Sequence, residues 1–256
     1  MEIYLFDNKR ILKSDMLNAI NFIEHVFSTK DFGNQGLHVG DTKKDVLNNR
    51  MNLTKAININ KNNLVSSEQV HGNSVKRVFI EDAGKGALEY GESLKNCDAL
   101  ITNTLNLPLF AFFADCVPIF LVDPIKKCIG IAHSGWKGTL NNIVGKTIDS
   151  FIKEFDSLPH NIIAVIGPYI KGKCYEVNSE IIELFTQAGY NKDKQIVGNN
   201  IDLGLIVQHQ LRQKGLIKIE LDNHCTSCDS SLFFSHRREL GITGRMAGII
   251  MLKENR

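Results

Sequence analysis

Residues 98–132 read DALITNTLNLPLFAFFADCVPIFLVDPIKKCIGIA. Apolar runs of strand length alternate there with turn residues, a pattern that is typical of short buried strands following one another directly. The segment predicts strands over Asp98–Thr102, Leu109–Phe113, Ile119–Val122 and Cys128–Ala132. Because no helical pattern separates these runs, the segment argues against a regular series of alternating strands and helices. It therefore predicts a mixed α/β fold.

The sequence on either side adds further strands and three amphipathic helices. Strands are expected over Met1–Phe6, Ser74–Ile80, Asn161–Ile166, Ile217–Leu221 and Met246–Leu252. Helices with apolar residues at helical spacing are expected over Leu140–Phe155, Asn178–Ala188 and Asp202–Lys214. Thr139 and Asn178 are suitable N-caps, and Gly215 is a usual helix-stop residue. Since no long linker interrupts the sequence, we expect one domain over residues 1–256.

Composition limits the class of protein. A hydrophobic fraction of 43% supports a packed core, and the formal net charge is only +2. Lys and Arg are scattered rather than clustered, so nucleic acid is not an expected partner. No run of about 18 apolar residues predicts a membrane span, and the N-terminus lacks the pattern of a signal peptide. The six cysteines are therefore expected to be reduced thiols of a cytoplasmic protein.

Three residues from separate segments indicate a metal site: His71, Cys116 and His133. Two imidazoles and a thiolate suit a borderline-soft divalent metal, most readily Zn²⁺. Three protein ligands would leave a fourth position for water or substrate, as in catalytic zinc sites. Taken singly, each has an ordinary alternative, such as an inert buried thiol for Cys116 or a surface position for His71. Their combination favours the metal site.

Polar residues beside these ligands indicate further chemistry. Asp115 lies in an otherwise apolar stretch, where an unpaired carboxylate is costly to bury, so we expect it in a polar site or capping a turn. His133 precedes Ser134-Gly-Trp-Lys137-Gly at an expected helix start. Backbone amides at a helix N-terminus, with Lys137 and the Ser134 hydroxyl, would form an anion site. The alternative is a tight strand-to-helix turn with Trp136 in the core.

A second cysteine motif lies near the C-terminus. Cys225-Thr-Ser-Cys228 has the spacing of half a zinc ribbon, but the sequence has no second Cys-x-x-Cys. His224 and His236 are candidates for the further ligands, yet neither has ribbon spacing. We therefore expect no second zinc site on this pair.

Several stretches together resemble a known family. They are Gln-Val-His-Gly (69–72), Ala-Asp-Cys-Val-Pro-Ile (114–119), Ala-His-Ser-Gly-Trp-Lys-Gly (132–138), Ile-Gly-Pro-Tyr-Ile (166–170), Cys-Tyr-Glu-Val (174–177), Phe-Phe-Ser-His-Arg-Arg (233–238) and Thr-Gly-Arg (243–245). In order, and over nearly the whole chain, they resemble the YfiH-like or laccase-domain family, long labelled multicopper polyphenol oxidases.

The resemblance implies one α/β domain of layered mixed β-sheets flanked by helices. It implies one metal, usually zinc and alternatively copper, on His71, Cys116 and His133. The implied substrates are purine nucleosides and phosphate. Phosphorolysis of adenosine, inosine and methylthioadenosine would give the free base and (methylthio)ribose 1-phosphate, and adenosine would also be deaminated. We expect a monomer or homodimer without nucleic-acid or membrane partners.

The residues themselves argue against the laccase label. Multicopper oxidation needs several copper centres with many histidine ligands, whereas this chain has eight histidines and no His-x-His pair. The sequence also departs from the family pattern at Ser134 and Lys137, where the family has alanine and arginine. Lysine keeps the charge of arginine but lacks its bidentate fork.

The resemblance and the residue types suggest roles for individual side chains. Cys116 and His133 would be catalytic through the metal, and Asp115 is the candidate acid or base. The candidates for binding substrate or phosphate are cationic or hydroxyl side chains: Arg50, Ser134, Lys137 and Arg245.

Two alternatives remain open at this point. Some relatives are described as peptidoglycan editing factors, in which Cys116 would be a nucleophile with His133 as its base and would remove a wrong amino acid from a cell-wall precursor. The other alternative is a non-catalytic regulatory protein with a structural metal. Metal content and activity on inosine with phosphate separate these functions.

Overall fold

In the computed structural model, which describes residues 1–190 and 195–254, the chain forms two six-stranded mixed sheets. The first has the order β1 (Glu2–Phe6), β2 (Lys9–Lys13), β3 (Ile23–Ser28), β14 (Met246–Leu252), β7 (Leu109–Phe113) and β4 (Val65–Ser66). The second has the order β13 (Lys218–Leu221), β10 (Ile163–Ile166), β8 (Val117–Asp123), β9 (Cys128–Ser134), β6 (Ala99–Thr102) and β5 (Val75–Arg77). This arrangement confirms the expected mixed α/β fold.

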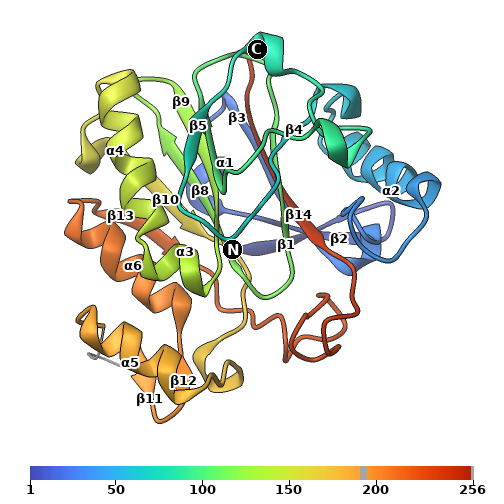
Figure 1. Ribbon diagram of the computed structural model, residues 1–256. Helices are drawn as coiled ribbons and strands as arrows, with labels where there is room; N and C mark the ends of the chain where they lie inside the picture. The colour runs from blue at the N-terminus through green and yellow to red at the C-terminus, as the bar shows by residue number, and fades with distance from the viewer. Residues whose placement is uncertain (191–194, 255–256) are drawn as a thin grey trace.

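The two sheets pack face to face and helices cover their outer faces (Figure 1). Between the sheets, the rings of Phe27 and Phe120 stack with centroids 4.1 Å apart. The outer face of the first sheet packs on α2 (Lys43–Ala56), and that of the second on α4 (Ile143–Phe155) and α6 (Leu203–Gln213). These contacts confirm the expected layered sheets flanked by helices.

Besides several short 3-10 helices, the described residues form a few smaller elements. They are α1 (Asp15–Asn18), α3 (Trp136–Leu140), α5 (Ser179–Gln187) and the hairpin of β11 (Ile196–Val197) and β12 (Asn200–Ile201). Among the described residues, no helix combines the length and the apolar character that crossing a membrane requires.

The helix expected over Leu140–Phe155 is in fact two helices. The first, α3, begins at Trp136 and not at Thr139, and Thr139 lies buried within it. The second, α4, begins after Asn142, whose backbone is left-handed with φ of 54°. The Asn142 side chain accepts a hydrogen bond from the Gly145 amide at 3.0 Å, so it caps α4 locally. Asparagine tolerates this left-handed backbone conformation. Apolar spacing alone does not detect the break, because the apolar residues keep helical spacing across it.

The sequence analysis missed α2, β2 and β3. In α2 the buried residues are Val46, Arg50, Leu53 and Thr54, so half of its inward face is polar and the apolar pattern of an amphipathic helix is absent. Strand β2 has only five residues, and β3 carries His25 on a buried position. Strand β3 is held by pairing with distant β14, and β2 pairs with β3 on one side and β1 on the other.

The connection between β7 and β8 crosses from the first sheet to the second at residues 114–116. Antiparallel pairing of β8 with β9 sets Val117 opposite Ser134 and Pro118 opposite His133. The register therefore brings Cys116, which directly precedes β8, next to the end of β9. This end of the second sheet is where the candidate site lies.

Candidate functional site

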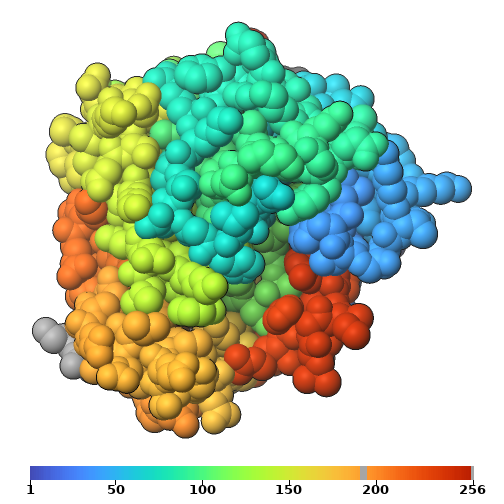
Figure 2. Space-filling model, viewed as in Figure 1, coloured from blue at the N-terminus to red at the C-terminus, as the bar shows by residue number. Residues whose placement is uncertain are grey.

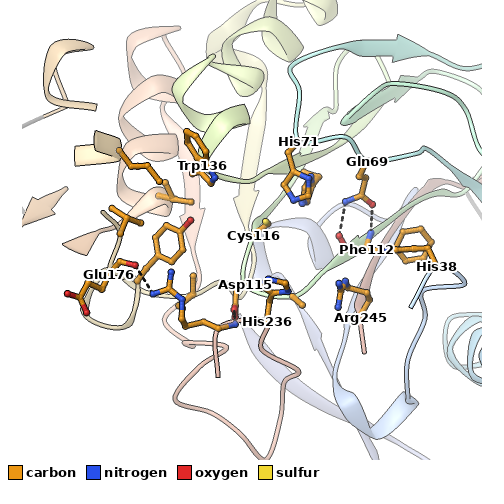
Figure 3. A pocket seen from close by; sticks show the side chains of 18 of the residues that line it. His38, Gln69, His71, Phe112, Asp115, Cys116, Trp136, Glu176, His236 and Arg245 are labelled. Atoms are coloured by element: carbon orange, nitrogen blue, oxygen red, sulfur yellow. Dashed lines mark hydrogen bonds between the residues drawn. The ribbon is translucent and has the colours of Figure 1, made fainter. Parts of the chain in front are cut away.

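Three ligand side chains meet at this end of the sheets. One ligand atom from each of His71, Cys116 and His133 lies within 4.8 Å of the others. The two imidazole rings are 4.8 Å apart between centroids and nearly perpendicular, at 79°. Figure 3 shows His71 and Cys116 facing the same space. We call these three residues the metal triad.

Asp98 orders the metal triad, and the sequence analysis missed it. Its carboxylate accepts hydrogen bonds from the amides of Val70, His71 and Gly72 at 3.3, 3.0 and 2.8 Å. The same carboxylate lies 2.9 Å from His133 Nδ1. This contact assigns the Nδ1 proton and leaves Nε2 as the lone-pair donor of His133. One buried carboxylate thus positions two of the three ligands, and it also offsets the strained left-handed backbone of His71, with φ of 60°.

Gly135 allows the triad to close. A Cβ atom at this position would lie 2.7 Å from His71 Cδ2 and 3.1 Å from Cys116 Sγ. The residue is the N-cap of α3 and follows directly after β9. The backbone therefore approaches two ligands more closely than any side chain would permit.

Gly135→Ala should therefore weaken metal binding by displacing His71 and Cys116. We expect the dissociation constant for Zn²⁺ to rise about tenfold to a hundredfold, the range usual for changes around a ligand set. Gly91→Ala is the matched control, because a Cβ at Gly91 would meet nothing within 4 Å. Equal zinc affinity in the two variants, measured by chelator competition, would contradict this role of Gly135.

The environment of Cys116 favours its thiolate. Burial opposes ionisation, but the imidazoles of His133 and His71 outweigh it and lower the pKa of Cys116 to about 6. For His133, burial is outweighed by Cys116 and Asp98, which raise its pKa to about 9. A thiolate is the form of cysteine that binds metal ions or acts as a nucleophile.

The donor set of the metal triad fits a divalent transition metal. Two imidazoles and one thiolate are borderline-soft ligands of the kind that zinc and copper accept. The carboxylate behind His133 is the usual outer partner of a histidine ligand. His71 is exposed, whereas Cys116 is half-buried and His133 is buried, so the centre opens on one side.

The open side faces a cavity of about 910 Å³. Figure 2 shows this face of the molecule hollowed between the amber segment around α5 and the orange-red segment before β14. Metal-triad residues form part of its lining. The remaining wall combines aromatic side chains with a few cationic and polar groups, including Tyr90, Phe112, Trp136, Tyr175, His38, Arg237 and Arg245. Cavities of this size and composition are typical of small-molecule sites.

Gln69 fixes the segment that carries His71. Its side-chain amide donates to the Phe112 carbonyl and accepts from the Phe112 amide, both at 2.8 Å (Figure 3). The side chain thus pairs with the edge of β7 as a strand residue would. Gln69 of the 69–72 motif therefore has a structural role: it anchors to β7 the segment that carries His71.

Asp115 lies beside the cavity with both carboxylate oxygens engaged. Oδ1 accepts from Thr226 Oγ1 at 2.6 Å, and Oδ2 accepts from Ser235 Oγ at 3.1 Å and from the Arg237 amide at 2.6 Å. Its backbone is left-handed, with φ of 82°. These bonds tie the β7–β8 connection to the C-terminal segment. The acid or base role of Asp115 stays a prediction, and its contacts give it a positioning role.

The four residues that were expected to bind substrate or phosphate lie in different places. Arg245 lines the cavity. Arg50 is buried instead: its guanidinium donates to the Gln35 carbonyl at 3.0 and 2.8 Å and lies over the rings of Phe110 and Phe112. The expected phosphate role of Arg50 therefore does not hold, because its donors are occupied inside the fold.

Ser134 and Lys137 also lie outside the described lining of the cavity. The Ser134 hydroxyl is buried and lies 2.7 Å from Thr139 Oγ1, so it stabilises the first turn of α3. Lys137 is exposed, with its ammonium 5.4 Å from the centre of the Trp136 ring. The strand-to-helix turn that was the alternative for this segment is thus present, and the half-buried Trp136 packs against the core while it also lines the cavity.

Comparison with known proteins agrees with this geometry. The model of a family described as Multi-copper polyphenol oxidoreductase laccase matches residues 24–253. The chain is 37% identical over 246 residues to Purine nucleoside phosphorylase YlmD of Bacillus subtilis (strain 168), which covers 89% of this chain and 88% of that protein. It is 32% identical over 216 residues to Adenosine deaminase RL5 of an unknown prokaryotic organism, with 80% of each covered.

A solved structure shares the whole fold. The hypothetical protein YfiH of Bacillus licheniformis superposes with a TM-score of 0.91 at 34% identity, covering 98% of this chain and 99% of that chain. The sequence resemblance to YfiH-like proteins is thereby confirmed. The chain belongs to the family described as Multi-copper polyphenol oxidoreductase laccase.

Proposed function

We propose that this protein is a metal-dependent purine nucleoside phosphorylase that also deaminates adenosine. The observation that carries the proposal is the metal triad opening into a cavity with aromatic walls and a partly buried arginine. The names of two relatives, a purine nucleoside phosphorylase and an adenosine deaminase, support the same substrate class.

The metal triad would hold one Zn²⁺ ion, with copper as the alternative. When bound, a divalent metal with three protein ligands keeps a position open for water or substrate and polarises it as a Lewis acid. The chain's own contribution is to orient the ligands through Asp98 and Gly135. It also presents a thiolate at Cys116, the softest of the three donors.

Aromatic side chains of the cavity suit a purine base. Trp136 and Arg245 lie on opposite sides of Cys116 (Figure 3). A base stacked towards Trp136 and a phosphate held towards Arg245 would place the ribose between them, next to the metal triad. Phosphorolysis then joins a phosphate oxygen to C1′ of the ribose, while the purine leaves with the electrons of the glycosidic bond and takes up a proton.

Arg245 is the cationic side chain that we assign to phosphate. Burial lowers its pKa because the guanidinium cation has lost part of its hydration. An anionic ligand would stabilise this cation. Its Nη1 donates to the carbonyls of Thr243 and Gly244 at 2.8 and 3.1 Å. These bonds fix the guanidinium plane and leave its other nitrogens for a ligand.

Arg245→Ala should raise the KM for phosphate about tenfold to a hundredfold, because one charge-assisted hydrogen bond contributes about 1.5–3 kcal/mol. Deamination of adenosine should change much less, since it uses water and no phosphate. Arg212→Ala, on an exposed position of α6, is the control. Equal losses of both activities in Arg245→Ala would show that Arg245 does not bind phosphate. A larger rise of the KM for phosphate in Lys137→Ala would instead support Lys137, the residue that the sequence suggested.

The proposed function is tested with inosine and phosphate. Purified metal-loaded protein should release hypoxanthine and ribose 1-phosphate in equal amounts, and adenosine should yield inosine in the absence of phosphate. Hypoxanthine without ribose 1-phosphate would indicate hydrolysis, and no reaction with any purine nucleoside would reject the proposal.

One observation favours the peptidoglycan-editing alternative. Against the effect of burial, the imidazoles of His133 and His71 lower the pKa of the Cys116 thiol to about 6, and His133 and Cys116 could act as a Cys–His nucleophile pair. A hydrolase of this kind would keep its activity after metal removal and lose it when the thiol is alkylated. The proposed phosphorylase would lose its activity on metal removal alone.

A further inference from the structure

A second group of sulfur ligands lies apart from the metal triad. The Sγ atoms of Cys174, Cys225 and Cys228 all lie within 4.8 Å of one another, and those of Cys174 and Cys228 are 3.3 Å apart. The sequence analysis considered His224 and His236 as partners of the Cys-x-x-Cys pair. The fold brings Cys174 instead, from the loop that follows β10. We call these three residues the thiol cluster.

Neither histidine joins the thiol cluster. His224 Nδ1 lies 3.0 Å from a carboxylate oxygen of Asp222, and His236 lines the cavity. Within the part of the chain that the structure describes, the cluster therefore consists of three sulfur ligands. Cys225 is buried, Cys174 is half-buried and Cys228 is exposed, so one side of the cluster faces solvent.

The backbone around Cys225 is arranged for a thiolate. The turn is closed by the Cys228 and Asp229 amides, which donate to the Cys225 carbonyl at 3.1 and 2.9 Å. The Cys225 amide donates to Asp229 Oδ2 at 3.0 Å. The Lys171 amide points at Cys225 Sγ from 3.4 Å, joined by the amides of Cys228 and Ser227. Amide donors directed at one sulfur stabilise its negative charge.

Burial and the surrounding hydrogen-bond donors act differently on the thiols of the cluster. Although burial opposes it, the amide donors lower the pKa of Cys225. Burial and the neighbouring Cys228 thiol raise the pKa of Cys174 to about 12. A soft metal ion would displace the protons of these thiols and bind the sulfurs as thiolates.

We propose that Cys174, Cys225 and Cys228 bind a second metal ion, Zn²⁺, with its fourth position open to solvent. Thiolates select soft or borderline cations such as zinc and Cu(I), and three sulfurs around one point exceed what a disulfide uses. When the metal binds, each thiol releases a proton to water and its sulfur coordinates the cation. Neither iron–sulfur chemistry nor a redox step is required.

The second site would act as a clamp on the cavity wall. Cys174 directly precedes Tyr175, Glu176 and Val177, which line the cavity. Thr226, between the two other cysteines, donates to Asp115 Oδ1 at 2.6 Å. One ion would thus join the loop after β10 to the connection that carries Cys116. The clamp role rests on the proposed function, whereas the binding of a second zinc ion does not.

Elemental analysis of zinc-loaded, reduced protein tests the proposal. Wild type should carry one zinc for each of the two clusters. Cys174→Ser, Cys228→Ser and Cys116→Ser should each lose one ion, and the double variant Cys116→Ser/Cys174→Ser should lose both. Cys174 and Cys228 are not buried, so serine there should fold. Cys97→Ser is the control, because Cys97 is a buried thiol outside both clusters.

Cobalt gives a readout that is independent of activity. In Cys116→Ser protein, Co²⁺ should produce sulfur-to-cobalt charge-transfer absorption that disappears in the double variant. The KM for inosine should rise in Cys174→Ser with a smaller change in kcat. Wild-type zinc content in Cys174→Ser would overturn the second site. The proposal would also fail if Cys116→Ser protein, prepared with reduced thiols, bound no cobalt and then oxidised to a Cys174–Cys228 disulfide.

Discussion

Replacing Cys116 by serine should abolish metal binding at the triad and reduce phosphorolysis at least about a hundredfold. A neutral hydroxyl is a poor substitute for a thiolate, and the Lewis acid that would be lost is worth several kcal/mol of transition-state stabilisation, with each 1.4 kcal/mol equal to about tenfold in rate. Zinc content and the rate of hypoxanthine release from inosine measure the two effects on the same samples.

Cys128→Ser is the matched control for this change. Cys128 is a buried thiol outside the metal triad, and burial raises its pKa to about 12, so it is an inert side chain in β9 near Ser157 Oγ. Its substitution should leave zinc content and rate close to those of wild type. If Cys116→Ser retained its metal but lost activity, Cys116 would be a nucleophile and the editing alternative would gain support.

Asp98→Asn should reduce zinc affinity by about a hundredfold, the upper end for a partner of metal ligands. The variant would present an NH₂ group to donors that now face a carboxylate: three backbone amides and His133 Nδ1. At least one buried donor would lose its acceptor, which costs about 1–3 kcal/mol of folding free energy. Chelator competition and thermal unfolding report the two losses.

Asp123→Asn separates the positioning effect from the loss of any buried carboxylate. Asp123 is equally buried, at the other end of β8 from Cys116. Its Oδ1 accepts from the Ile125 and Lys126 amides at 2.9 and 3.0 Å, bonds that an asparagine carbonyl can keep. Asp123→Asn should therefore retain zinc affinity. If both variants bound zinc as tightly as wild type, the account of Asp98 would be wrong.

The central strands could be read from the sequence because each is buried on both faces. Strand β7 begins and ends where it was predicted, at Leu109 and Phe113, and β14 does so at Met246 and Leu252. Helix α2 could not be read in this way, since it buries Arg50 against Phe110 and backbone carbonyls. A buried arginine has no signature in a pattern of apolar spacing.

The ligand types of the metal triad could be identified from the sequence, but what supports them could not. Asp98 lies far along the chain from His71 and is joined to it only by tertiary contacts. Lys137 and Arg245 are both cations near glycines, and only the fold shows that Arg245 lines the cavity while Lys137 is exposed. Likewise, Cys174 joins the Cys-x-x-Cys pair across the fold, where no spacing rule applies.

The most direct measurement is phosphate-dependent hypoxanthine release from inosine as Zn²⁺ is returned to metal-free protein. The account predicts almost no release without metal and a rate that rises with zinc until the metal triad is filled. Cys116→Ser should stay inactive throughout the titration. Full phosphorolysis by metal-free wild type, or by metal-free Cys116→Ser, would contradict the claim that the metal triad is the catalytic centre.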